Sequence, residues 1–324
     1  MKKLIRIIIC ITLVFLLMVV FQEMSRMRII VDFNTAYTYS TLSRDIMGLK
    51  IAYPALIKVN NIGFSAMNRK IPIIMLGKGE KKALIVSAIH AREFLTAGFT
   101  MRCVEEYAKA YYSESGMYGK YNIKQVLNDF TLFLVPVANP DGLEIVTAEE
   151  FTLYDCSRKE ETYKRNANGV NLNRNFPFFW EKITDGNDIA LENFKGNKKS
   201  SEPETQALIK LCKEENFEWM FSMHLKGNNI FWRDEANGEI QGDEKIADKL
   251  VGECSYIKSQ VTNDVNAYAG GFENWFRSTF GKPAFCIELV PLDKNYNYEP
   301  ERTNDFENLT NWNKTKYTFL QGMI

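Results

Sequence analysis

Histidine is the scarcest informative residue type in this chain, with only 2 among 324 residues. The sequence also has no excess charge of either sign, because 40 lysines and arginines balance 40 aspartates and glutamates. No stripe of basic residues is interleaved with aromatic ones. We therefore expect no binding to nucleic acid, since no overall positive field would attract a polyanion.

Cysteine is also sparse, and its 6 copies form no CxxC pair. Cys10 lies in an apolar run near the N-terminus, and the other cysteines occur singly along the rest of the chain. This spacing fits neither a disulfide framework nor a cysteine-based zinc site. We expect most of these cysteines to be buried as small hydrophobic residues, with at most a pair or two bridged.

The chain opens with a segment that differs from the rest, MKKLIRIIICITLVFLLMVVFQEMSRMR. Its lysines and Arg6 precede an uncharged apolar run over residues 7–21. Such a pattern is typical of a targeting or membrane segment. No small-residue cleavage site follows, so we expect residues 1–27 to be a retained single-pass anchor in the cell membrane. The positive end would stay inside and the rest would be extracytoplasmic; secretion after cleavage is the alternative.

The rest of the chain alternates apolar runs of strand length with amphipathic helical patterns. Strands are predicted within residues 70–90, 129–142, 218–227 and 282–290, and helices within 38–54, 94–108, 201–214 and 270–280. Because the strands are almost wholly apolar, the pattern predicts an α/β fold with a mixed, mostly parallel sheet covered by helices on both faces. No linker or repeat divides residues 35–324, so we expect one domain there.

Both histidines lie where a predicted strand ends. His90 stands in SAIHAREF, three residues before Glu93, and His224 stands in FSMHLKG. Ligands gather at strand ends in α/β sheets, and two histidines with one carboxylate form the residue set of an open catalytic zinc site. A core histidine hydrogen-bonded to a nearby acid would give the same local pattern. These residues alone leave both interpretations open.

Six motifs occur in order along the chain: SAIHAREFLTAG, VANPDG, GVNLNRNFP, SEPET, MHLKGNNIFW and PAFCIEL. Together they resemble the zinc carboxypeptidases of the carboxypeptidase A type over residues 35–290. The resemblance implies a zinc metallopeptidase with the zinc carboxypeptidase fold. It also implies that His90, Glu93 and His224 bind one zinc ion per chain.

The same resemblance assigns roles to three more residues. Glu288 in FCIEL falls at the general base, a carboxylate that takes a proton from the attacking water and passes it to the leaving amine. Asn173 and Arg174 in NLNRNF fall at the pair that holds a substrate carboxylate, a group that the planar guanidinium fork binds at two points.

Further residues are assigned by gapless alignment through the same motifs. Lys164 is expected to stabilise the oxyanion of the reaction, with the adjacent Arg165 as the alternative. Tyr268 precedes GGFENW at a shorter offset than in the animal enzymes, so it is assigned without a gapless match to the tyrosine that closes over the substrate. Glu273 in GGFENW falls at the floor of the specificity pocket, where an acid favours a substrate side chain ending in an ammonium group. An acid facing solvent at a helix start is the alternative for Glu273.

Two segments are similar to a bacterial branch of that family, the γ-D-glutamyl-diamino acid peptidases: HLKGNNIFW, and YAGGFENWF followed by PAFCIEL. This similarity implies a peptide substrate from the cell wall, which an outward-facing anchor would suit. We expect a membrane-anchored zinc metallopeptidase that hydrolyses a peptide bond next to a diamino acid in peptidoglycan stem peptides. The alternatives are a general carboxypeptidase that removes a C-terminal residue, basic or otherwise, and an inactive anchored peptide-binding protein.

Overall fold

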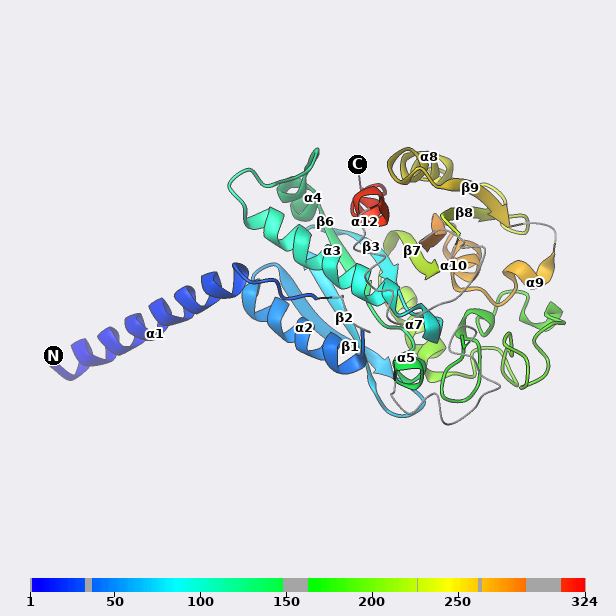
Figure 1. Cartoon of the computed structure of the whole chain (residues 1–324), viewed down its shortest axis with the longest axis horizontal. Helices are drawn as coiled ribbons and strands as arrows, with labels where there is room; N and C mark the ends of the chain where they lie inside the picture. Colours follow the sequence, from blue (N-terminus) through cyan, green and yellow to red (C-terminus); the bar gives the residue numbers. More distant parts are fainter. Residues whose placement is uncertain are drawn as a thin grey trace.

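A computed structural model describes residues 2–32, 37–147, 163–225, 227–261, 264–289 and 310–323. An 8-stranded sheet with the order β1-β2-β6-β3-β7-β10-β8-β9 forms the centre of the domain (Figure 1). Its strands are β1 (Ile57–Phe64), β2 (Lys70–Gly77), β3 (Lys81–Val86), β6 (Phe130–Val135), β7 (Phe217–Leu225), β8 (Asn229–Asp234), β9 (Ile257–Val261) and β10 (Ala284–Leu289). A small separate sheet pairs β4 (Met117–Tyr118) with β5 (Tyr121–Asn122).

The sheet is mixed, as the sequence predicts. Its four central strands, β6, β3, β7 and β10, run parallel to one another. Towards one edge, β2 is antiparallel to β6 and β1 is antiparallel to β2. Towards the other edge, β8 is antiparallel to β10, and β9 runs parallel to β8. Strands buried on both faces need apolar side chains throughout, which is why the central strands were the ones visible in the sequence.

Helices cover both faces of the sheet. They are α2 (Tyr39–Ala52), α3 (Leu95–Tyr112), α4 (Ile123–Asp129), α5 (Pro140–Thr147), α7 (Pro203–Glu214), α8 (Asp243–Cys254), α9 (Val265–Tyr268), α10 (Phe272–Phe280) and α12 (Thr310–Thr315). Short 3-10 turns are η1 (Ala91–Glu93), η2 (Leu172–Arg174), η3 (Trp180–Lys182) and η5 (Thr318–Leu320).

The alternation of side chains along β3 shows how the two layers form. Ala83 and Ile85 pack into a core cluster that includes buried residues of α2 and α3. Leu84 and Val86 point to the other face and pack into a second cluster, with α7 and α10. A strand has a side-chain period of 2, so one apolar run supplies both cores.

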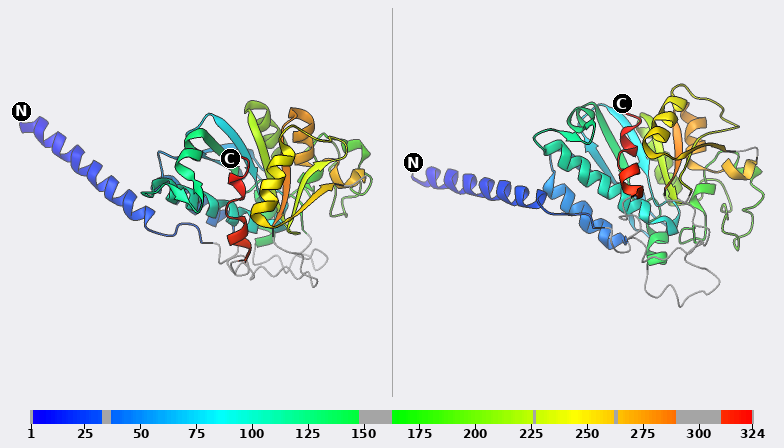
Figure 2. Two further views of the ribbon diagram at one scale, coloured as in Figure 1. Left: turned by 90° about the horizontal axis from the view of Figure 1, so that it is seen from above. Right: turned by 45° about the horizontal axis from the view of Figure 1, so that its top comes forward.

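The N-terminal helix α1 (Lys2–Arg26) projects away from the domain (Figures 1 and 2). It is long and apolar enough to cross a membrane, and none of its apolar window is buried by the domain. Its last turn is nevertheless held by the domain, because the side chains of Gln22 and Arg26 donate to the Ala52 carbonyl at 3.2 and 2.9 Å. The Arg26 guanidinium also lies 4.0 Å from the centre of the Tyr112 ring.

A buried carboxylate holds the chain that follows α1. Glu105 on α3 is fully buried and accepts hydrogen bonds from the amides of Ile30 and Val31 at 2.8 and 3.0 Å. Lys109 pairs with the same carboxylate at 2.8 Å. Residues 30 and 31 are therefore bound to the domain rather than forming a free linker.

Cysteines within the described residues behave as the sequence predicts. Cys103, Cys212, Cys254 and Cys286 are buried free thiols, and Cys10 is exposed on α1. Cys156, together with the polar and aromatic segment YNYEPERTNDF (296–306), lies outside the described residues.

Candidate active site

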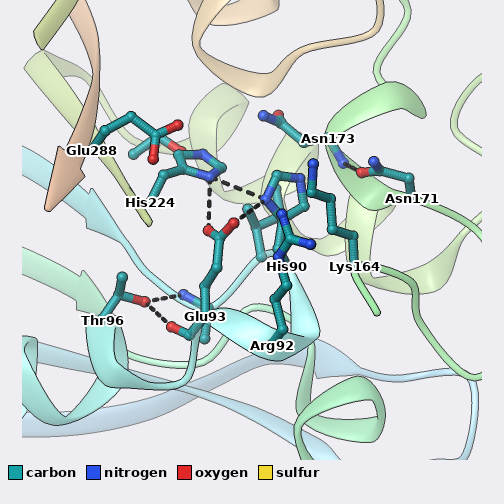
Figure 3. A network of polar contacts seen from close by, with 12 residues as sticks. His90, Arg92, Glu93, Thr96, Lys164, Asn171, Asn173, His224 and Glu288 are labelled. Atoms are coloured by element: carbon teal, nitrogen blue, oxygen red, sulfur yellow. Dashed lines mark hydrogen bonds and ion pairs between the residues drawn. The ribbon is translucent and has the colours of Figure 1, made fainter. Parts of the chain in front are cut away.

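The first two residues of the site come from the chain that leaves β3. The strand ends before His90, in contrast to the prediction, because Ala88 has a positive φ of 47° that breaks the extended conformation. The turn η1 (Ala91–Glu93) then carries Glu93 back towards His90 (Figure 3). The Thr96 hydroxyl closes this turn: it accepts from the Ala88 amide at 2.9 Å and donates to the Glu93 carbonyl at 2.7 Å.

His224 comes from the carboxyl end of β7 and meets the other two residues. The nitrogens His90 Nδ1 and His224 Nδ1 lie 2.9 and 3.0 Å from the two oxygens of the Glu93 carboxylate, respectively. The two Nδ1 atoms are 3.2 Å apart. All three side chains are buried, with 8%, 2% and 1% of the surface of His90, Glu93 and His224 exposed.

These side chains strongly perturb one another. Burial lowers the pKa of His90 to about 3, in spite of the nearby Glu93 carboxylate. Burial also disfavours a charge on His224, but the Glu93 carboxylate raises the pKa of His224 to about 9. Burial alone would raise the pKa of Glu93, yet the two imidazoles hold it well below its usual value. The site therefore keeps an ionised carboxylate between two imidazole nitrogens.

This arrangement fits a bound zinc ion. Zinc accepts imidazole nitrogens and carboxylate oxygens, and a tetrahedral ion with Zn–N distances of about 2.0–2.1 Å separates two nitrogen ligands by about 3.3 Å. The observed separation of the two Nδ1 atoms is 3.2 Å, and the potential ligand atoms of all three residues lie within 4.8 Å of one another. Ligand atoms this close together can bind one shared cation.

Ser222 orients the second histidine. Its hydroxyl lies 2.9 Å from His224 Nε2, the ring nitrogen that faces away from Glu93. When Nδ1 binds a metal ion, Nε2 carries the ring proton and donates it to the hydroxyl; a partner of this kind fixes the tautomer and angle of a metal-binding imidazole. Ser222 was not predicted as a site residue. The period of a strand could have revealed it, because residues two apart share a face.

Glu288 lies beside His224, on the neighbouring strand (Figure 3). The Cα atoms of Glu288 and His224 are direct partners in the parallel pairing of β10 with β7. One carboxylate oxygen, Oε2, is buried and has no hydrogen-bond partner in the described part of the chain. Burial raises the pKa of Glu288 to about 7. A carboxyl group with such a pKa can accept and release a proton near neutral pH.

A pocket of about 220 Å³ opens beside these residues. It is lined by the two histidines and by Lys164, Asn173, Arg174, Glu273 and Glu288, all of which the sequence analysis proposed. Chain segments far apart in the sequence therefore contribute to a single concave site. Concave sites with a few convergent polar groups are typical of ligand binding.

Asn173 and Arg174 form most of η2. The Asn173 amide oxygen accepts from the Phe272 amide at 2.7 Å, which fixes the orientation of its side chain. The Arg174 guanidinium donates to the Asn173 carbonyl at 2.9 Å, while its Nε is buried without a partner among the described residues. Burial lowers the pKa of Arg174. An anion in the pocket would satisfy this arginine.

The glycine pair before α10 allows that arrangement. Gly270 has a φ of 70°, and a Cβ atom there would lie 2.3 Å from the Arg174 carbonyl oxygen. The Gly270 carbonyl also accepts from the Phe176 amide at 3.1 Å. Only glycine tolerates both the backbone conformation and the close approach, so the motif GGFENW fits the chain that carries Arg174.

Lys164 and Arg165 differ in their position relative to the pocket. Lys164 lines the pocket, and its amine is 3.4 Å from Glu192. Figure 3 shows its side chain beside the His90 ring. Arg165 is buried outside the pocket lining and donates to the Ile189 carbonyl at 2.6 Å.

Tyr268 also lies outside the pocket lining. Its ring packs 6.2 Å, between centroids, from the rings of both Phe178 and Phe179. To reach a ligand in the pocket, this side chain would have to leave its aromatic neighbours.

Comparisons with known proteins agree with the fold and identify the family. The sequence profile of the zinc carboxypeptidase family, Peptidase M14, matches residues 43–314. The γ-D-glutamyl-L-diamino acid endopeptidase 1 of Lysinibacillus sphaericus is 30% identical over 265 residues, which cover 78% of this chain and 65% of that protein. Carboxypeptidase B of Astacus astacus is 24% identical over 274 residues, covering 80% and 87% of the two chains.

Solved structures show the same architecture. Carboxypeptidase A of Helicoverpa armigera superposes with a TM-score of 0.71 at 17% sequence identity, covering 92% of this chain and 74% of that one. Thrombin-activatable fibrinolysis inhibitor superposes with a TM-score of 0.74 at 17% identity, covering 93% and 77%. These identities are low, so the likeness concerns the fold. The family profile spans well over half of the sequence, and the chain therefore belongs to the zinc carboxypeptidase family, Peptidase M14, whose members are zinc metallopeptidases.

Proposed function

We propose that this chain is a membrane-anchored zinc peptidase that hydrolyses a peptide bond next to a diamino acid in peptidoglycan stem peptides, of the γ-D-glutamyl-diaminopimelate type. The observation that carries the proposal is Glu273, an acid of the pocket whose Oε2 is buried without a partner among the described residues. Such a carboxylate favours a substrate that brings an ammonium group. The Lysinibacillus relative, whose name specifies a γ-D-glutamyl-L-diamino acid substrate, supports the same class.

Under this proposal the metal would be held by His90, Glu93 and His224. Zinc in such a site supplies a Lewis acid that polarises a carbonyl and lowers the pKa of water. Glu288 takes a proton from the attacking water and delivers it to the amine nitrogen as the peptide bond breaks. Its pKa of about 7 suits both transfers, because the same group must accept and then release the proton.

The remaining pocket residues would bind and orient the peptide. The ammonium of Lys164 faces the carbonyl oxygen on which negative charge develops, and it stabilises that charge. Its pairing with Glu192 is partly exposed and therefore weak enough to be exchanged for substrate. Asn173 and Arg174 hold a carboxylate of the substrate. Arg165, outside the pocket, positions the backbone next to Lys164.

We also propose that residues 1–27 remain as the anchor and that residues 35–324 form the catalytic domain on the extracytoplasmic side. The length and exposed apolar surface of α1 support a membrane span. The basic residues before its apolar run favour an inside position for the N-terminus. The contacts that Gln22 and Arg26 make with Ala52 support retention, since a cleaved segment would lose them.

The test uses the full-length, zinc-loaded chain in detergent with two substrates, L-Ala-γ-D-Glu-meso-diaminopimelate and hippuryl-Lys, and identifies the products by mass. Release of diaminopimelate that Glu288→Gln abolishes is the expected result. Cleavage of hippuryl-Lys alone would instead indicate a general carboxypeptidase. Zinc-loaded protein that binds the wall peptide and cleaves neither substrate would indicate an anchored binding protein.

A further inference from the structure

Most charged side chains of the pocket either form an ion pair or have a role proposed above. Arg277 is almost fully buried, pairs with Asp243 at 2.7 Å and donates to two backbone carbonyls. Lys164 is paired with Glu192. The carboxylate of Glu288 is the proposed proton carrier.

Two opposite charges of the pocket remain, Arg233 and Glu273. Neither takes part in an ion pair or a side-chain hydrogen bond within the described part of the chain. They come from separate elements, Arg233 from β8 and Glu273 from the first turn of α10. Besides Arg174 and Glu288, whose roles are proposed above, the pocket thus presents a cation and an anion that no described residue pairs with.

Arg233 is held in a defined place. Its guanidinium lies 4.5 Å from the centre of the Trp232 ring, and Trp232 is itself buried. The pairing of β8 with β9 shifts register between Phe231 and Arg233, and bulges of this kind redirect side chains. Stacking on an aromatic face leaves the edge of a guanidinium free, and that edge is the part that binds a carboxylate at two points.

We infer that Arg233 and Glu273 together recognise the far end of a diamino acid side chain, Glu273 binding its ammonium group and Arg233 its carboxylate. This inference rests on the proposed function and specifies its substrate. Lysine ends in an ammonium group alone, whereas diaminopimelate ends in an ammonium and a carboxylate on the same carbon. Arg233 is therefore a specificity-determining residue that selects diaminopimelate over lysine.

The experiment compares two tripeptides, L-Ala-γ-D-Glu-meso-diaminopimelate and L-Ala-γ-D-Glu-L-Lys, which differ only at the side-chain carboxylate. For the full-length, zinc-loaded chain we expect a higher kcat/KM with the diaminopimelate peptide. Arg233→Gln should lower that kcat/KM by about 10- to 100-fold and leave the lysine peptide within about twofold. Glu273→Gln should weaken both peptides, because both carry the ammonium group.

Two further variants separate charge from geometry. Arg233→Lys keeps the positive charge without the planar fork and should retain only part of the preference. Lys213→Gln removes one exposed positive charge on α7 and should change neither peptide. An equal loss with both peptides in Arg233→Gln, at an unchanged melting temperature, would overturn the inference, and so would an unchanged preference.

A binding measurement keeps this test separate from the test of the proposed function. Calorimetry in the Glu288→Gln background gives the Kd of each peptide without turnover. Tighter binding of the diaminopimelate peptide that Arg233→Gln removes supports the recognition. If the wild-type chain cleaves neither peptide, the proposed function fails, and the binding preference still decides the role of Arg233.

Discussion

The hydroxyl of Ser222 provides a direct test of how the ligand set is built. It is the hydrogen-bond partner of His224 Nε2, on a histidine with only 1% of its surface exposed. Ser222→Ala would leave a buried ring N–H without a partner, which costs about 1–3 kcal/mol. The cost falls largely on the metal-bound state, because the ring must keep its orientation there. We expect the zinc dissociation constant to rise by about 10- to 100-fold, as for other lost partners of metal-binding histidines.

The assay is a competition titration of zinc against a chelator of known affinity. Ser65→Ala is a matched control, because it also removes a buried hydroxyl. The Ser65 hydroxyl donates to Asp141 at 2.8 Å and does not contact His90, Glu93 or His224. The control should keep the zinc affinity of the wild type even if it lowers thermal stability. An unchanged zinc dissociation constant in a folded Ser222→Ala variant would refute the reasoning, since it would mean that the hydroxyl does not set the ring.

Three other predictions follow from contacts described above. Glu288→Gln should lower kcat by about 100- to 10,000-fold with the zinc content unchanged, and reduced zinc binding in that variant would point to a ligand role instead. Glu105→Ala removes the acceptor of two backbone amides, and thermal unfolding should show a loss of about 3 kcal/mol. The loss should be about 0.5 kcal/mol in Glu106→Ala, whose side chain is partly exposed and pairs with Arg102. Removal of zinc by a chelator should abolish activity and lower the melting temperature, and added zinc should restore both; full activity in metal-free protein would contradict the zinc assignment.

The parts of the fold that the sequence predicted are the ones with an unambiguous burial pattern. The runs that became β3, β6, β7 and β10 are apolar on both faces, and only a central strand needs that. The edge strands β1 and β9, and β8 next to β9, were not predicted. The exposed faces of the two edge strands carry polar residues, as in NNIGF and IKSQV, that also suit loops.

The residues of the candidate site also differ in whether the sequence predicts their positions. The histidines and Glu288 follow buried runs, so their place at one edge of the sheet could be inferred from the sequence. Arg233 could not, because a charged residue near a strand end usually faces solvent, and its place in the pocket depends on a bulge and on Trp232. Tyr268 was assigned by alignment alone, which carries no information about the packing of its ring against Phe178.

The way α1 joins the domain has a consequence for where the enzyme can work. Because Arg26 and the amides of Ile30 and Val31 are bound to the domain, only a short length of free chain separates α1 from the domain. If α1 spans a membrane, as proposed above, the enzyme would diffuse in two dimensions and reach only the thin layer of wall that borders the membrane. A flexible insert of about 20 glycine and serine residues after Met27 would add a reach of about 25 Å. In the proposed membrane-anchored enzyme, this insert would let the catalytic domain reach a deeper layer of the wall.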